Sequence, residues 1–238
     1  TLHEAGHGLY EQGLPESQYG LPLGRYASLG IHESQSRLWE NFVGRRASFW
    51  DHFYPRAQAL FPDALGNTSQ HDFYRAINRV APSLIRVEAD EVTYNLHIAI
   101  RFELERDLIG GQLTVPDLPG AWDQKYQDYL GIQPDSDANG VLQDVHWSAG
   151  LFGYFPTYAL GNLYAAQFYA TAEQDLGDLD ADFSAGKFTS LRNWLVDRVH
   201  VQGRRWTGPQ LGEHVTGEKL GSSHLVSYLK EKLARVYG

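Results

Sequence analysis

TLHEAGHGLYEQG, residues 1–13, contains the pattern H-E-x-x-H inside a segment with the composition of a helix. Gly13 and the glycine- and proline-rich residues 14–24 give this helix a stop. Because residues four apart lie on one face of a helix, His3 and His7 can present both imidazoles to one cation. The stretch therefore predicts a helix that holds a metal ion.

Glu4 directly follows the first of these histidines. In this position a carboxylate can accept a proton from a water molecule as that water attacks a carbonyl. Catalytic zinc usually takes three protein ligands and leaves a fourth position for water or substrate. The pattern predicts a zinc-dependent peptidase, and the alternative is two unrelated histidines on an amphipathic helix.

The third ligand is expected to be an acidic residue from a second element. Glu33 is favoured because it follows a loop long enough to return the chain and begins a helical pattern. His32 is the rival, although adjacent residues point about 100° apart on a helix. The downstream acidic candidates are Glu11, Glu16, Glu33 and Glu40.

Length and composition predict one large folded domain. The chain has 238 residues, of which 42% are hydrophobic and 21% charged, and it carries a net charge of -9. That charge argues against nucleic acid as a partner, no apolar run is long enough to span a membrane, and the lack of cysteine excludes a thiolate site. A chain without Met that begins inside its own metal-binding helix is expected to be a fragment.

The patterning predicts one mainly helical domain over residues 1–238, with at most a small β element. Helical spacing runs through residues 31–61, 122–129 and 223–237, whereas residues 84–94 fit a helix or a strand equally well. Residues 145–172 predict a helix that is entered through an irregular loop.

Five segments occur in an order that resembles the Taq-type carboxypeptidases, metallocarboxypeptidase family thirty-two. They are H-E-A-G-H at 3–7, H-E-S-Q at 32–35, I-R-V-E-A-D at 85–90, G-V-L-Q-D-V-H-W at 140–147 and G-Y-F-P-T-Y-A-L-G-N at 153–162. The family's H-P-F and D-x-R-x-T motifs, which precede H-E-x-x-H, have no match in this chain. The resemblance therefore predicts the C-terminal catalytic part of a longer protein.

The resemblance implies a mainly helical, gluzincin-type fold with a deep groove and a divalent metal, zinc or cobalt. It also implies peptide substrates with a free C-terminus, removal of single C-terminal residues with broad side-chain tolerance, and a cytoplasmic homodimer. No nucleic acid or membrane is expected as a partner.

Arg86, inside the matching I-R-V-E-A-D segment, is the candidate for binding the substrate's C-terminal carboxylate, because a fixed guanidinium can do so bidentately. The alternative is a structural ion pair with Glu88 or Asp90. Gln35 is expected to orient substrate or carboxylates.

His146 and Tyr158 are expected to stabilise the oxyanion that forms when an amide is attacked, by analogy with related helical gluzincins. Tyr154, four residues earlier, is the alternative to Tyr158, and ordinary core packing is the alternative for both tyrosines. Asp90 and Asp144 are candidates for orienting the ligating histidines, with buried ion pairing as the alternative.

The leading function is thus a metal-dependent carboxypeptidase. An endopeptidase or dipeptidyl carboxypeptidase would use the same zinc chemistry and differ in the size of its products. An inactive metal-binding fragment is the alternative from a different class.

Overall fold

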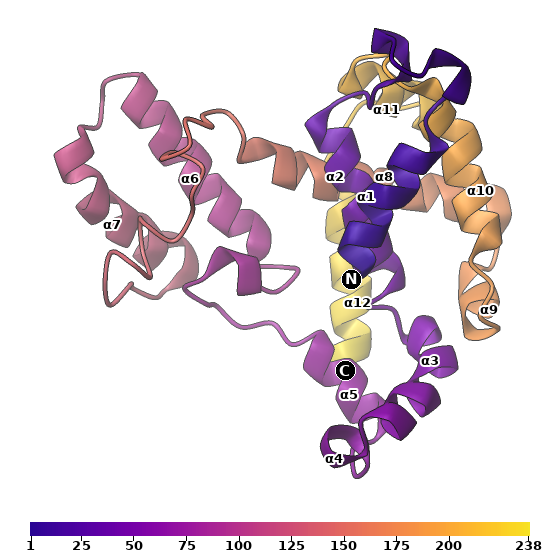
Figure 1. Cartoon of the computed structure of the whole chain (residues 1–238). Helices are drawn as coiled ribbons and strands as arrows, with labels where there is room; N and C mark the ends of the chain where they lie inside the picture. Colours follow the sequence, from indigo (N-terminus) through magenta and orange to yellow (C-terminus); the bar gives the residue numbers. More distant parts are fainter. The chain divides into compact units, whose positions relative to one another are not determined.

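The computed structural model describes all residues 1–238, which form two compact units. The first unit comprises Thr1–Asn78 and Leu160–Gly238, and the second comprises Arg79–Ala159. The prediction of a single domain over the whole chain stays a prediction. The predicted mainly helical fold is confirmed, since every regular element is a helix (Figure 1).

The first unit contains most of the helices. They are α1 Leu2–Gly13, η1 Glu16–Gln18, η2 Pro22–Gly24, α2 Leu29–Arg37, η3 Leu38–Val43, α3 Ala47–Leu60, α4 Pro62–Leu65, α5 Gln70–Ile77, α9 Leu179–Ser184, α10 Thr189–Arg198, η6 His200–Gln202, α11 Gly208–Thr216 and α12 Ser223–Tyr237, together with α8 Pro156–Leu176 from Leu160 onward. No helix in the chain is both long enough and apolar enough to cross a membrane.

The second unit is built on two longer helices that lie side by side in Figure 1. They are α6 Tyr94–Ile109 and α7 Leu118–Leu130, accompanied by η4 Arg86–Glu88 and η5 Val115–Asp117. The segment 84–94, which fits either helix or strand by sequence, is mostly irregular, with one turn of 3-10 helix before α6 begins.

Helix α1 packs against α2 (Figure 1), and Gly6 lies where the two helices approach each other. A Cβ atom at Gly6 would lie 2.5 Å from the backbone oxygen of Gln35 and 2.6 Å from Cα of Ser36. Only glycine permits this approach, and Tyr10, one turn further on, is fully buried in the core of this unit. The crossing brings the face of α1 that carries His3 and His7 close to α2.

Helix α2 buries an unusual run of polar residues, Glu33 to Ser36. Ser28 caps its N-terminus by accepting a hydrogen bond from the Ile31 N–H. The hydroxyls of Ser34 and Ser36 donate to carbonyls three residues earlier, which satisfies them inside the core. Burying such polar groups costs free energy unless they are hydrogen-bonded. The segment includes Glu33, the predicted third metal ligand.

The predicted helical segment 31–61 is divided into three parts. After α2 the backbone widens into the π-helix η3, and α3 begins only at Ala47. Single π-helical turns inside helices often mark functional sites. Here the π-helix carries Glu40, one of the four acidic candidates.

Candidate active site

Helices α1 and α2 bring three potential metal ligands together. His3 Nε2 and His7 Nε2 are 3.2 Å apart, and Glu33 Oε2 lies 3.8 Å from the first and 3.6 Å from the second. The donor atoms of these three residues all lie within 4.8 Å of one another, so the group could hold one metal ion. The predicted pairing of both histidines with Glu33 is thus matched by their positions.

The donor set fits a divalent metal. Tetrahedral ligands at about 2.0–2.1 Å from an ion lie about 3.3–3.4 Å from one another, close to the observed spacings. Two imidazoles and one carboxylate are also the donor types of catalytic zinc sites. Such a set leaves a coordination position for water or substrate.

Arg37 fixes the orientation of Glu33. Its Nε donates to Glu33 Oε1 at 2.7 Å, so the other oxygen, Oε2, is the one that faces the histidines. Glu33 is only 6% exposed, and Gly161 of α8 packs against its side chain so closely that a Cβ would lie 2.5 Å from Glu33 Cγ. Arg37 therefore fixes the carboxylate, and Gly161 confines the rest of the Glu33 side chain.

Glu40 contacts the other ring nitrogen of His3. Its Oε2 lies 2.9 Å from His3 Nδ1 and also accepts from Arg37 Nη1 at 3.2 Å. Burial raises the pKa of Glu40, but the hydrogen bond from His3 and the charge of Arg37 outweigh this effect and lower the pKa to about 2. The carboxylate is therefore ionised and favours a proton on His3 Nδ1, which leaves Nε2 able to accept a metal ion.

His32, the rival ligand, does not belong to the three-residue group. Its Nδ1 lies 2.6 Å from His7 Nδ1, and its Nε2 lies 2.9 Å from Glu11 Oε1. Burial and the neighbouring His32 ring lower the pKa of His7. His32 thus contacts the ring nitrogen of His7 that does not face Glu33, and it stays away from the place where a metal would bind.

The candidate base and the candidate orienting amide differ in exposure. Glu4 is exposed on α1, one residue from His3, and its carboxylate makes no hydrogen bond or ion pair. Gln35 is fully buried; its Oε1 lies 2.9 Å from His200 Nε2, and its amide donates to the Ser34 hydroxyl. Gln35 therefore has no exposed atom to offer a substrate, and its contacts join α2 to η6.

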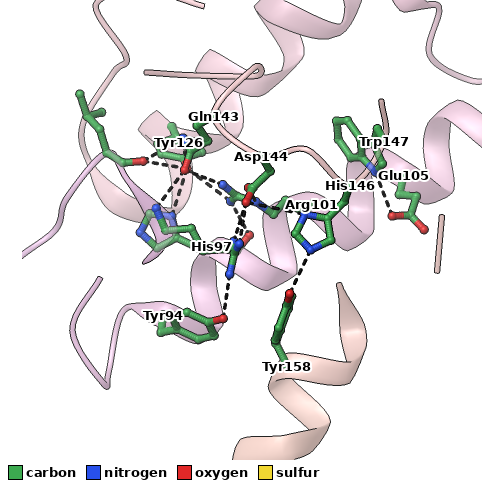
Figure 2. Close-up of polar contacts among 12 residues, drawn as sticks. Tyr94, His97, Arg101, Glu105, Tyr126, Gln143, Asp144, His146, Trp147 and Tyr158 are labelled. Carbon is green, nitrogen blue, oxygen red and sulfur yellow. Dashed lines mark hydrogen bonds and ion pairs between the residues drawn. The ribbon is translucent and has the colours of Figure 1, made fainter. Parts of the chain in front are cut away.

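Arg86 lies in the second unit and contacts a buried polar network around Asp144. Figure 2 labels Asp144, Tyr94 and Arg101 in this network. Arg86 Nε and Nη2 donate to Asp144 Oδ1 at 3.0 and 2.6 Å, and its Nη1 donates to the Tyr94 hydroxyl at 2.9 Å. Arg101 donates to the other oxygen of Asp144 at 2.6 Å. The ion pair considered as the alternative role therefore exists, but its partner is Asp144.

For Asp144, a candidate for orienting the histidines, the contacts match the alternative of buried ion pairing, and Asp90 makes local contacts. Asp90 caps the turn before α6, where its oxygens accept from the backbone N–H groups of Val92 and Thr93. Burial raises the pKa of Asp144, but the contacts with Arg86 and Arg101 outweigh this effect, and the pKa is lowered. Within the first unit, Glu40 contacts His3 and His32 contacts His7.

His146 and Tyr158 contact each other in the second unit (Figure 2). His146 Nε2 lies 3.0 Å from the Tyr158 hydroxyl oxygen, and His146 Nδ1 lies 3.8 Å from Asp144 Oδ1. Burial lowers the pKa of His146, which favours the neutral ring. Tyr154 also packs near this pair, with its ring centroid 5.3 Å from that of His146. The structure thus joins the two predicted oxyanion residues, and their catalytic role stays a prediction.

Sequence reasoning missed the contacts that Arg37, His32 and Arg101 make. The i, i+4 spacing of Glu33 and Arg37 is a signal for their ion pair, and Glu40 continues the same helix face. The contact of Arg101 with Asp144 joins residues 43 positions apart and has no local signal.

Comparison with known proteins supports the same family. The model of the carboxypeptidase Taq (M32) metallopeptidases matches residues 1–233. Thermostable carboxypeptidase 1 of Thermus thermophilus is 55% identical over 238 residues, which cover 100% of this chain and 46% of that protein. Carboxypeptidase 1 of Bacillus subtilis is 48% identical, with 100% of this chain and 47% of that protein covered.

A solved structure agrees with these sequence matches. The M32 carboxypeptidase from Deinococcus radiodurans R1 superposes with a TM-score of 0.97 at 48% identity, covering 100% of this chain and 48% of that one. The chain spans about half the length of the curated relatives it matches. With the family match over nearly its whole length, the chain belongs to the carboxypeptidase Taq (M32) metallopeptidase family.

Proposed function

We propose that this chain carries the metal centre of a carboxypeptidase that removes single residues from the C-termini of peptides with broad specificity. The observation that carries the proposal is the convergence of His3, His7 and Glu33. Glu33 Oε2 faces the histidines, and Arg37 donates to the other oxygen, Oε1. Family membership and the names of the relatives support carboxypeptidase activity over other peptide hydrolysis.

In this proposal His3, His7 and Glu33 hold a zinc or cobalt ion. When bound, the ion supplies a Lewis acid that polarises the scissile carbonyl and lowers the pKa of water. Glu4 accepts the proton of the attacking water and returns it to the departing amine. The exposed position of Glu4 beside His3 supports this role, because its carboxylate is not engaged elsewhere.

Further residues are proposed to act on the substrate. His146 and Tyr158 are proposed to donate to the developing oxyanion, with Tyr154 as the alternative donor. For Arg86, which is 5% exposed and ion-paired with Asp144, the contacts favour the structural role over capture of the substrate carboxylate. Gln35, fully buried, is proposed to support α2.

The family resemblance also leads us to propose further features. They are a deep substrate groove, a cytoplasmic location and a homodimer, with neither nucleic acid nor membrane as a partner. The net charge of -9 supports the proposal on nucleic acid, because phosphate backbones attract clustered lysine and arginine.

Product analysis tests the proposed activity. With the chain loaded with Zn²⁺, a peptide with a free C-terminus should release single amino acids in order from that end, as measured by mass spectrometry. The same peptide with an amidated C-terminus should be cleaved far more slowly, because the terminal carboxylate is part of the recognised group. Dipeptides or internal fragments would favour the dipeptidyl carboxypeptidase or endopeptidase, and bound Zn²⁺ without turnover would favour the inactive metal-binding fragment.

A further inference from the structure

The two ligating histidines differ in what contacts their Nδ1 atoms. His3 Nδ1 contacts a carboxylate, Glu40, directly. His7 Nδ1 contacts the ring of His32, and a carboxylate, Glu11, follows on the far nitrogen of that ring. We infer that His32 and Glu11 are positioning residues that hold His7 in the tautomer and ring orientation required for metal binding. The inference rests on the metal centre proposed above.

The chemistry of imidazole sets the direction of the hydrogen bonds in this relay. A neutral ring that binds a metal through Nε2 carries its proton on Nδ1, so His7 Nδ1–H donates to His32 Nδ1. His32 then carries its own proton on Nε2 and donates it to Glu11 Oε1. The distances of 2.6 Å and 2.9 Å fit both steps, and no nitrogen of His32 is left for a metal.

Packing holds the His32 ring in place for this contact. The ring of Tyr10, which is fully buried, lies edge-on to it at 5.3 Å between centroids, and the ring of Tyr26 lies edge-on at 5.0 Å. Arg204 in turn holds Tyr26, with Nε donating to the Tyr26 carbonyl at 3.1 Å and the guanidinium over its ring. The orientation of His32 is therefore set by neighbours that are not metal ligands.

Glu11 is the exposed end of the relay. Its side chain is 52% exposed and lines a cavity of about 640 Å³ together with Glu16, Tyr26 and Arg204. Glu11 lies on α1, one turn beyond His7, whereas His32 lies on α2. The relay thus spans the same helix pair that carries the three ligands, and a purely structural link between α1 and α2 is the reading to be distinguished.

Zn²⁺ affinity and histidine tautomers separate the two readings. His32→Leu removes the acceptor, whereas His32→Asn keeps an oxygen near the position of Nδ1. Because partners of ligating histidines typically contribute 10–100-fold to metal affinity, His32→Leu should weaken Zn²⁺ binding by about 10–100-fold and His32→Asn by less. Glu11→Gln should weaken it more than Glu16→Gln, which removes the same charge from the same cavity.

The measurements are competition with a chromophoric chelator and ¹⁵N NMR of histidine-labelled chain, with thermal unfolding of the metal-free chain as the stability control. In the unsubstituted chain, NMR should show His7 protonated on Nδ1 and His32 on Nε2 before Zn²⁺ is added. In His32→Leu, metal-free His7 should become a mixture of tautomers.

The outcomes distinguish this inference from the proposed metal centre. Unchanged Zn²⁺ affinity and an unchanged His7 tautomer in His32→Leu would overturn the positioning role alone. The same holds for a loss of affinity that only follows a loss of thermal stability and that His32→Asn does not rescue. An unsubstituted chain that binds no Zn²⁺ would overturn the metal centre and the inference together.

Discussion

Glu4→Gln is expected to lower peptide turnover by about 10²–10⁴-fold, the usual contribution of a general base, while leaving Zn²⁺ affinity unchanged. The amide that replaces the carboxylate cannot accept the proton of the attacking water. Because Glu4 is exposed and its carboxylate makes no hydrogen bond or ion pair, the substitution disrupts no internal contact. The loss should therefore appear in kcat and leave the fold intact.

The measurement is the rate of amino-acid release from a peptide by the Zn²⁺-loaded chain, with Zn²⁺ affinity determined on the same samples. Glu16→Gln is the matched control, since it removes an equivalent charge from a residue outside the metal group. Turnover of Glu4→Gln equal to that of the unsubstituted chain would remove Glu4 from the mechanism.

Gly6→Ala is expected to destabilise the first unit by about 1–3 kcal/mol, a typical effect of overpacking. The added Cβ would lie 2.5 Å from the Gln35 carbonyl oxygen and 2.6 Å from Ser36 Cα, both of them backbone atoms that can move only with α2. Such a movement would separate His3 and His7 from Glu33. Zn²⁺ affinity should therefore fall together with stability.

Gly8→Ala is the matched control for this substitution. It lies on the same helix, two residues away, and a Cβ atom at Gly8 would meet nothing within 4 Å, so alanine should stabilise α1 by about 0.5–1 kcal/mol. Urea unfolding of both variants measures the difference. Equal stability and equal Zn²⁺ affinity of the two variants would contradict the close α1–α2 contact.

The grouping of His3, His7 and Glu33 could be predicted from sequence because its signals are local. The spacing of His3 and His7 needs only a helix, and the loop before Glu33 is long enough to bring a second helix back. The predicted C-terminal helix 223–237 coincides with α12, Ser223–Tyr237, where the amphipathic pattern is strong.

Apart from the i, i+4 pair of Glu33 and Arg37, the contacts behind the candidate ligands could not be predicted, because they depend on how helices cross. Glu40 reaches His3 from a π-helix, an irregularity without a sequence signal in this segment. The burial of Gln35 depends on His200, 165 residues away. Similarly, Arg86 pairs with Asp144, 58 residues away, rather than with the acidic neighbours in its own segment.

The most direct test of the central claim is X-ray absorption spectroscopy of the purified chain with bound Zn²⁺, together with metal content for the single variants His3→Ala, His7→Ala and Glu33→Ala. We expect a single Zn²⁺ per chain with two imidazole nitrogens and a carboxylate oxygen in its coordination sphere, and a large loss of metal from each variant. A bound ion that survives all three substitutions, or a coordination sphere without imidazole, would contradict a metal centre at His3, His7 and Glu33.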